Sequence, residues 1–291
     1  MIKRLAILGV GLIGGSLARA LRDAGHAQEI VGYGRGLANL QRAVELGVVD
    51  RIETSLSAAV NGADMVVLAT PVGTMPEILA AIAPYLGKDT VVTDVGSVKG
   101  TVADTARAAL GPKLAGFVPG HPIAGTERSG VEASLANLYV GRRVVLTPLP
   151  ENKPETVMRV RSMWQAAGAE VVEMSVAHHD EVLAATSHLP HLLAYALVDL
   201  LAQLEDRREV FAFAAGGFRD FTRIASSDPV MWRDISLANR DAIVQMLKHY
   251  RGELDGLISA IANGEGEKLQ QLFTRAKAAR DAFINNDSKK E

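Results

Sequence analysis

The chain has 291 residues, enough for two domains of ordinary size, and 48% of them are hydrophobic while 22% are charged, as in soluble globular proteins. Its formal net charge of -2 offers no broad cationic surface, so we expect neither a nucleic-acid partner nor a membrane partner. The sequence lacks cysteine and any apolar run of the roughly 18 residues that a membrane span needs, which excludes disulfides and cysteine-ligated zinc and favours the cytoplasm.

The N-terminus resembles a signal peptide at first sight. Lys3 and Arg4 precede an apolar run over residues 5–18, and Ala-Arg-Ala at 18–20 mimics a cleavage site. Three glycines interrupt the run, however, and Arg19 and Arg22 continue it as an amphipathic helix. We therefore interpret this segment as part of the fold.

Strands and helices alternate in the first part of the chain. Short β-branched runs predict strands over residues 4–8, 29–33, 65–69, 90–93, 117–119, 143–146 and 171–172. Helices are predicted over residues 13–24, 37–46, 74–85, 98–109 and 153–167. This alternation predicts an α/β domain over residues 1–175, with a parallel sheet that is covered on both faces.

A glycine-rich turn lies between the first strand and the first helix. The nucleotide-binding residues predicted there are Gly9, Gly11, Leu12, Ile13 and Gly14. In such a motif the first glycine allows a tight turn, the second lets the backbone approach a pyrophosphate, and the third lets the helix pack on the strand. Because strand, turn, helix and second strand occur in the expected order, the motif predicts a Rossmann domain that binds a dinucleotide.

The end of the second strand bears on the choice of cofactor. NAD-binding proteins usually carry an Asp or Glu there, but this chain has Gly34 and Arg35. An arginine fork can hold a 2′-phosphate that a carboxylate would repel, so NADP is favoured and NAD stays possible, since Arg35 could be merely solvated. Thr70 and Pro71 follow the strand at residues 65–69 and are predicted on the nicotinamide side.

Four polar, glycine-rich or proline-rich segments stand out against this background, at residues 94–100, 120–127, 187–191 and 216–223. Taken singly, each could be an ordinary turn. The first two follow predicted strands and therefore emerge at the same sheet edge as the glycine turn. Their convergence favours a substrate site there.

Two histidine pieces suggest different chemistry. His121 follows a strand and is the best candidate for a general acid or base, although a lone histidine is more often a packed structural residue. His188 and His191 are spaced like a metal-binding pair, but Pro190 interrupts the helix between them and no third ligand is evident. We therefore expect no metal site.

Two further side chains could line a pocket. Arg223 could bind a carboxylate through its planar fork, or could form a surface ion pair with Asp220 or Asp228. Trp232 could form the wall of a ring-binding pocket, or could belong to the core. The sequence leaves both alternatives open.

From Val176 onward the pattern is helical, with breaks near Pro190, residues 216–217, Pro229 and Gly264, and predicts an all-α domain over residues 176–291. Apolar residues recur there at steps of four and three, at Ile243, Leu247, Tyr250, Leu254, Leu257 and Ile261. This spacing fits the seam of a dimer and a core helix of a single chain equally well.

Taken together, these motifs resemble those of the prephenate/arogenate (cyclohexadienyl) dehydrogenases. The resemblance rests on Gly-Val-Gly-Leu-Ile-Gly-Gly-Ser at 9–16, Asp-Val-Gly-Ser-Val-Lys at 94–99, Gly-His-Pro-Ile-Ala-Gly-Thr-Glu at 120–127, Ser-His-Leu-Pro-His at 187–191 and Asp-Phe-Thr-Arg-Ile-Ala at 220–225. The first motif is generic to nucleotide binders, and those around His121 and His188 are far more specific. The resemblance implies a Rossmann domain followed by a helical domain that dimerises, in an enzyme that makes tyrosine or its precursor. Because the glycine turn begins within ten residues of the start and the last predicted helix ends near residue 284, we expect the enzyme to be monofunctional.

The resemblance also implies roles for individual residues. His121 would take the proton of the ring hydroxyl, Ser97 would position that hydroxyl and orient His121, and His188 would lie near the substrate and the nicotinamide. Arg223 would bind a substrate carboxylate. Residues at the mouth and wall of the pocket would be Glu127, Asp220 and Trp232.

Two other functions remain as alternatives. A β-hydroxyacid dehydrogenase would need a catalytic lysine in the first long helix of the second domain, and residues 182–201 contain none. An NADP-sensing regulatory protein could share the fold, but it would have no need of His121, His188 and Arg223. The sequence does not decide between prephenate and arogenate as the substrate.

Overall fold

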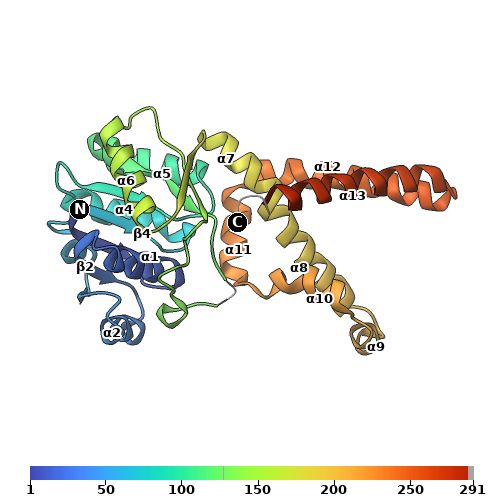
Figure 1. The fold of residues 1–291 in the computed structure, drawn as a ribbon, viewed down its shortest axis with the longest axis horizontal. Coiled ribbons are helices and arrows are strands. Elements are labelled where there is room, and N and C mark those ends of the chain that lie inside the picture. The colour runs from blue at the N-terminus through green and yellow to red at the C-terminus, as the bar shows by residue number, and fades with distance from the viewer. Residues whose placement is uncertain (127, 288–291) are drawn as a thin grey trace. The chain divides into compact units, whose positions relative to one another are not determined.

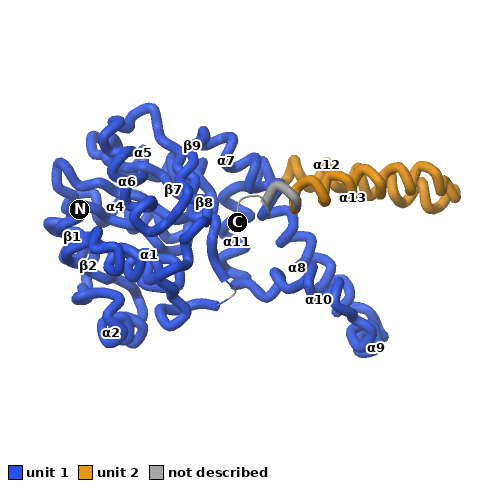
Figure 2. The backbone as a smooth tube through the Cα atoms, viewed as in Figure 1, with its two compact units in different colours: residues 1–243 blue, residues 244–291 orange. Residues whose placement is uncertain are grey.

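The computed structural model of the chain describes residues 1–126 and 128–287. Its residues fall into two compact units, Met1–Ile243 and Val244–Glu291 (Figure 2). The predicted domain boundary between residues 175 and 176 falls inside the first unit and stays a prediction. In the described part of the chain, no helix is both long and apolar enough to cross a bilayer.

A parallel sheet of six strands organises the first part of unit 1 (Figure 1). The strand order is β3-β2-β1-β4-β5-β6, which is that of a Rossmann fold. The strands are β1 (Ile2–Leu8), β2 (Ala27–Tyr33), β3 (Arg51–Glu53), β4 (Met65–Leu68), β5 (Val91–Asp94) and β6 (Phe117–Val118). The helices that connect or follow them are α1 (Leu12–Asp23), α2 (Leu37–Glu45), α3 (Leu56–Val60), α4 (Met75–Ile82), α5 (Gly100–Leu110) and α6 (Pro154–Ala166).

Both faces of this sheet are buried at its centre, which explains the continuous apolar runs Leu-Ala-Ile-Leu of β1 and Met-Val-Val-Leu of β4. Leu5 and Ile7 of β1 belong to a core that includes residues of α1 and α6. Ala6 and Leu8 point the other way, into a core with residues of α4 and α5. The alternation of side chains along one strand thus contributes to two hydrophobic layers.

The chain then leaves the first sheet at Pro119. A second sheet has the order β7-β8-β9, with β7 (Gly120–Pro122) antiparallel to β8 (Arg143–Leu146) and β8 parallel to β9 (Glu170–Glu173). The prediction of one parallel sheet that includes residues 143–146 and 171–172 was therefore wrong. Proline lacks an N–H donor for a strand ladder, and the Pro119 carbonyl instead accepts a hydrogen bond from Thr147.

Other predicted strands and helices of the first part are confirmed within a few residues, but three short ones were missed: β7, β3 and α3. The edge strand β3 is only three residues long and reads Arg-Ile-Glu, without an apolar run. The five-residue helix α3 is capped by Ser55, whose side chain accepts a hydrogen bond from the Ala58 N–H. Elements this short carry too little periodicity to be predicted.

The remainder of unit 1 is helical, as predicted. It contains α7 (Val176–Leu183), a π-helical turn η5 (Ala184–His188), α8 (Leu189–Ala202), α9 (Arg207–Ala212), α10 (Gly216–Thr222), the 3₁₀ turn η6 (Arg223–Ser226) and α11 (Pro229–Ala238). Helix α12 (Arg240–Ala262) begins in unit 1, and unit 2 comprises the rest of α12 and α13 (Gly266–Asp287) (Figure 2).

The glycine turn makes a prediction about stability. Gly9 has φ +107°, and a Cβ there would lie 2.4 Å from the Ala69 carbonyl oxygen, so Gly9→Ala should lower the free energy of unfolding. We expect a loss of about 2 kcal/mol or more in urea denaturation, from backbone strain and the clash. Gly11→Ala is the matched control, because a Cβ there meets nothing within 4 Å. Equal effects of the two variants would contradict the conformation described for this turn.

Candidate active site

The backbone of the glycine turn has the shape that a dinucleotide requires. A Cβ at Gly14 would lie 2.2 Å from the Gly9 carbonyl oxygen, so only glycine allows α1 to pack this closely on the turn. Gly11 is the N-cap of α1 and has open space where a side chain would be. Backbone N–H groups in the first turn of α1, including those of Leu12 and Ile13, are therefore accessible to a pyrophosphate. These residues fit a dinucleotide.

The positions predicted for the two ends of the cofactor also lie at this edge of the sheet. Gly34 and the exposed Arg35 directly follow β2, and a Cβ at Gly34 would come no closer than 3.5 Å to the Leu40 side chain. Thr70 and Pro71 follow β4, the neighbour of β1 on its other side. The Thr70 hydroxyl is buried and has no hydrogen-bond partner among the described residues.

A buried ion pair lies beneath the next loop of the same edge. The Lys99 ammonium contacts the Asp94 carboxylate, and both side chains have 0% exposure. Lys99 also donates to the Gly120 carbonyl at 2.6 Å, while Asp94 accepts from the Gly120 N–H at 3.1 Å and from the Gly96 N–H at 2.8 Å. Burial lowers the pKa of Lys99, although the charge of Asp94 opposes that effect. The pair therefore holds the first residue of β7 from both sides.

His121, the next residue of β7, is hydrogen-bonded to a second histidine. Its Nδ1 lies 2.9 Å from Nε2 of His179, and Nδ1 of His179 lies 2.8 Å from a carboxylate oxygen of Asp180. The structure therefore shows that His179 on α7 helps to orient His121, and the role expected for Ser97 stays a prediction. Burial, followed by the nearby His179, Lys99 and His188, lowers the pKa of His121 well below its ordinary value. His121 is consequently a neutral base at physiological pH.

The Asp180 carboxylate also binds the N-terminus of α5. It accepts from the Lys99 N–H at 2.8 Å and from the Gly100 N–H at 2.7 Å. Burial would raise the pKa of Asp180, but hydrogen bonds from His179 and from these two backbone groups lower it. Asp180 is therefore an ionised group that connects α7 to the Rossmann part of the unit.

His188 lies at the end of the π-helical turn η5 and is almost fully buried, at 1% exposure. Its Nδ1 is 3.1 Å from the amide nitrogen of Asn239, which also donates to the Asp180 carbonyl at 2.9 Å. Because the amide donates, Nδ1 accepts and the proton of His188 resides on Nε2. That Nε2 makes no hydrogen bond of ordinary geometry among the described residues, although the Ser97 backbone lies close enough to raise the pKa; burial outweighs this and lowers the pKa of His188 to about 4. A buried N–H without a partner suits a substrate oxygen.

Trp232 and Arg223 adjoin this group. The Trp232 ring stacks on His191 with centroids 3.8 Å apart and meets His188 edge-on at 6.1 Å. Trp232 is 7% exposed, and its Nε1 has no hydrogen-bond partner in the described part of the chain. The positive charge of Arg223 contributes to a lowered pKa of His191, behind the larger effect of burial, so Arg223 lies in the same neighbourhood.

The other predicted residues are placed less fully. Ser97 is half-buried in the loop after β5. Its backbone raises the pKa of His188, so Ser97 lies next to that histidine. Asp220 is exposed on α10, one turn before Arg223. Glu127 lies outside the described residues.

Asp228, the other candidate partner of Arg223, caps α11 through the N–H groups of Val230 and Met231. No group of three or more potential metal ligands occurs among the residues described.

Sequence reasoning missed Lys99, His179, Asp180 and Asn239. Lys99 is part of the 94–100 segment, and its separation of five residues from Asp94 around one loop is a signal for a buried pair. His179 and Asp180 lie in the first half of α7 next to the exposed His178, and their sequence alone reads as a solvated helix start. Only the packing of α7 on α5 gives them a role.

The buried histidine at position 188 makes stability depend on pH. Its pKa is about 4 in the folded chain and about 6.5 when unfolded, so below pH 6.5 the unfolded state binds more protons. This histidine alone should lower the free energy of unfolding by about 3 kcal/mol between pH 7 and pH 4. Urea denaturation of the parent and of His188→Asn at both pH values tests this, with the exposed His178→Asn as control. The same pH dependence in all three proteins would contradict it.

Family models match the chain in two consecutive parts. The nucleotide-binding domain of prephenate dehydrogenase matches residues 17–173, and the dimerization domain of prephenate dehydrogenase matches residues 175–275. A cyclohexadienyl dehydrogenase of Zymomonas mobilis is 38% identical over 285 residues, which cover 97% of this chain and 97% of that relative.

Solved structures agree with this. The crystal structure of prephenate dehydrogenase from Aquifex aeolicus in complex with hydroxyphenyl propionate and NAD+ has a TM-score of 0.90 at 39% identity, and the match covers 96% of this chain and 98% of that one. The arogenate dehydrogenase of Synechocystis has a TM-score of 0.82 at 32% identity, with coverage of 96% and 99%. With both family models and a nearly full-length relative in agreement, the chain belongs to the prephenate dehydrogenase family.

Proposed function

We propose that this chain catalyses the oxidative decarboxylation of prephenate, of arogenate or of both, with a nicotinamide dinucleotide as the oxidant. The observation that carries the proposal is His121, a buried neutral imidazole on β7. The residue before it, Gly120, is hydrogen-bonded to Asp94 at the carboxyl end of β5, in the sheet whose β1 leads into the glycine turn. The similarity to prephenate, cyclohexadienyl and arogenate dehydrogenases supports the reaction class.

The reaction asks for few protein groups. The substrate is a cyclohexadienol with a quaternary carboxylate at C1 and a hydroxyl at C4. A bound nicotinamide supplies the oxidation by accepting hydride from C4. His121 takes the proton of the C4 hydroxyl, and loss of CO2 then restores an aromatic ring and needs little further help. The protein must mainly align C4 with the cofactor, bind two anionic groups and provide one base.

The remaining residues would bind the substrate. His188 offers its buried Nε2–H to a substrate oxygen, and Arg223 offers a fork that matches a carboxylate. Trp232 provides an apolar wall next to both histidines of the Ser-His-Leu-Pro-His motif. Ser97 would position the C4 hydroxyl, and Asp220 would lie at the pocket mouth. The role proposed for Glu127 rests on its motif alone.

We also propose NADP as the preferred cofactor. The end of β2 carries no carboxylate, and the exposed Arg35 can approach a 2′-phosphate from solvent. The relative from Aquifex aeolicus was solved with NAD+, so NAD stays the alternative for this chain.

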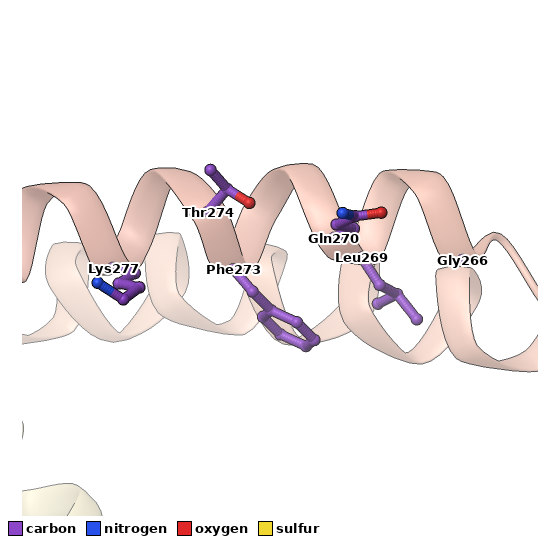
Figure 3. A pocket seen from close by; sticks show the side chains of 6 residues that line it. All are labelled: Gly266, Leu269, Gln270, Phe273, Thr274 and Lys277. Atoms are coloured by element: carbon purple, nitrogen blue, oxygen red, sulfur yellow. The ribbon is translucent and has the colours of Figure 1, made fainter.

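The protein is further proposed to act as a homodimer in the cytoplasm. Large apolar side chains of unit 2 face solvent in the single chain, among them Leu254, Ile258, Ile261, Phe273 and Phe283. Leu269 and Phe273 project to the same side of α13 and line a surface pocket (Figure 3). Exposed apolar surface of this kind is typical of an interface, and the matching family model is a dimerization domain. Leu254 and Ile261 favour the dimer seam for the later part of the pattern over residues 243–261, whereas Ile243 at its start is buried within the chain.

His121→Asn should lower kcat by about 10²- to 10⁴-fold and leave the KM of the substrate nearly unchanged, because it removes the proton acceptor. The rate is followed by the absorbance of the reduced nicotinamide with prephenate, arogenate, NADP and NAD in all combinations. His178→Asn, at an exposed position on α7, is the control and should keep the parental rate. An unaltered kcat with a raised KM would make His121 a binding group, and the absence of any rate in the parent would refute the proposed reaction.

Gly34→Asp should shift the ratio of kcat/KM for NADP over NAD toward NAD by about tenfold or more. The new carboxylate would bond the ribose hydroxyls of NAD and repel a 2′-phosphate. The site has room for it, since the nearest atom to a Cβ is 3.5 Å away on Leu40. Ala38→Asp adds the same charge at an exposed position of α2 and should change the ratio much less. An unchanged ratio in Gly34→Asp would refute the proposed cofactor preference.

A further inference from the structure

Three buried side chains form a line of hydrogen bonds that ends at the proposed base. His121 Nδ1 is 2.9 Å from His179 Nε2, and His179 Nδ1 is 2.8 Å from Oδ1 of Asp180. The two imidazoles meet edge-on, with ring centroids 5.2 Å apart and planes at 64°. The exposure of His179 is 0% and that of His121 is 8%, so water does not replace these partners.

The direction of each bond follows from the carboxylate. An ionised Asp180 can only accept, so Nδ1 of His179 carries its proton. A neutral His179 then has a lone pair on Nε2, and Nδ1 of His121 must donate to it. The proton of His121 is thereby held on Nδ1, and its Nε2 keeps a lone pair, which is what a general base requires.

The charge of Asp180 is held in place from a second direction. Its Oδ1 accepts from the Lys99 N–H at 2.8 Å and its Oδ2 from the Gly100 N–H at 2.7 Å. These groups begin α5, a helix of 11 residues whose N-terminus favours a negative charge. The carboxylate therefore stays ionised, and its position is set by the Rossmann part of the unit rather than by α7 alone.

The other tautomer of His179 and its protonated form are both disfavoured. With its proton on Nε2, His179 would direct the lone pair of Nδ1 at the Asp180 carboxylate. A protonated His179 would donate from both nitrogens, and then His121 would hold its proton on Nε2 and lose its basic atom. Burial opposes that charge on His179, and the Lys99 ammonium repels it, while Asp180 and Asp94 attract it. The first two effects prevail, since the pKa of His179 is lowered.

We propose that His179 and Asp180 are positioning residues that hold His121 in the tautomer with a free Nε2, so that this atom can take the proton of the substrate hydroxyl. The inference rests on the proposed function, in which His121 is the base. It goes further in assigning a task to two side chains on α7 that do not themselves touch the reacting atoms.

The tautomer can be observed without any activity. In the full-length protein with ¹⁵N-labelled histidine, the spectrum of His121 should show a protonated Nδ1 and an unprotonated Nε2 at pH 7.5. The signals are assigned by their loss in His121→Asn. A protonated Nε2 in the parent protein would overturn the inference, whatever the enzyme catalyses.

Kinetics supply the second arm, with three variants at neighbouring positions. His179→Leu removes the acceptor for His121 Nδ1 and should lower kcat by about 10²-fold or more, with both KM values within about threefold, since a wrong tautomer beside an intact site acts on turnover. His179→Gln places an amide oxygen near the position of Nε2 and should recover at least about tenfold of that loss. His178→Leu is the matched control on the exposed face of α7 and should keep the parental kcat.

These results separate the two proposals. If His121→Asn loses turnover while His179→Leu keeps it, the base is correct and the positioning role is wrong. If His121→Asn keeps its turnover, His121 is not the base, and the ¹⁵N spectrum still decides its tautomer; if the parent itself shows no rate with any substrate and cofactor, the proposed function fails. If His179→Leu does not fold, the kcat of His179→Gln is compared with that of the parent, and the ¹⁵N spectrum of the parent is read beside it. A protonated Nδ1 in that spectrum supports the positioning role, and a protonated Nε2 overturns it.

Discussion

The buried pair of Lys99 and Asp94 is the constraint on which the site depends. Two charges without solvent are costly to bury, and removing one partner of such a pair costs about 3–5 kcal/mol because the other is left unpaired. Here the pair is completed by backbone groups, since Gly120 both donates to Asp94 and accepts from Lys99. The residue that precedes His121 is therefore fixed in position, and the ammonium also disfavours a second positive charge on His121.

Asp180 on α7 connects the helical part of unit 1 to the loop that carries Lys99. The Asp180 carboxylate accepts hydrogen bonds from the first N–H groups of α5 and from His179, which is the partner of His121. Its carbonyl accepts from Asn239, which is the partner of His188. The consequence is that the two imidazoles have different tasks. His121 presents a lone pair and His188 presents an N–H, although both are buried and both have a lowered pKa. A substrate that carries a hydroxyl proton and oxygen acceptors needs one of each.

Much of the fold and the composition of the site could be predicted from the sequence, because the signals are local. The glycine turn, the alternation of strands and helices, and the motifs around His121 and His188 each lie within a few neighbouring residues. The switch at Pro119 into a second sheet was missed, because the pattern of residues 143–146 is that of a strand in either sheet. Asp180 was missed for a different reason: its partners are 80 and 81 residues away, and no spacing in the sequence reveals them.

Cofactor choice is the feature for which family membership is the weakest guide, because it depends on one or two side chains at the end of β2. Arg35 is exposed, and an exposed ion pair contributes only about 0–1 kcal/mol. In the proposed preference for NADP, the missing carboxylate at position 34 therefore matters more than the arginine that follows it. A carboxylate there would act twice, by repelling a 2′-phosphate and by binding the free hydroxyls of NAD. Its absence removes both effects, so discrimination by this chain should be moderate rather than strict.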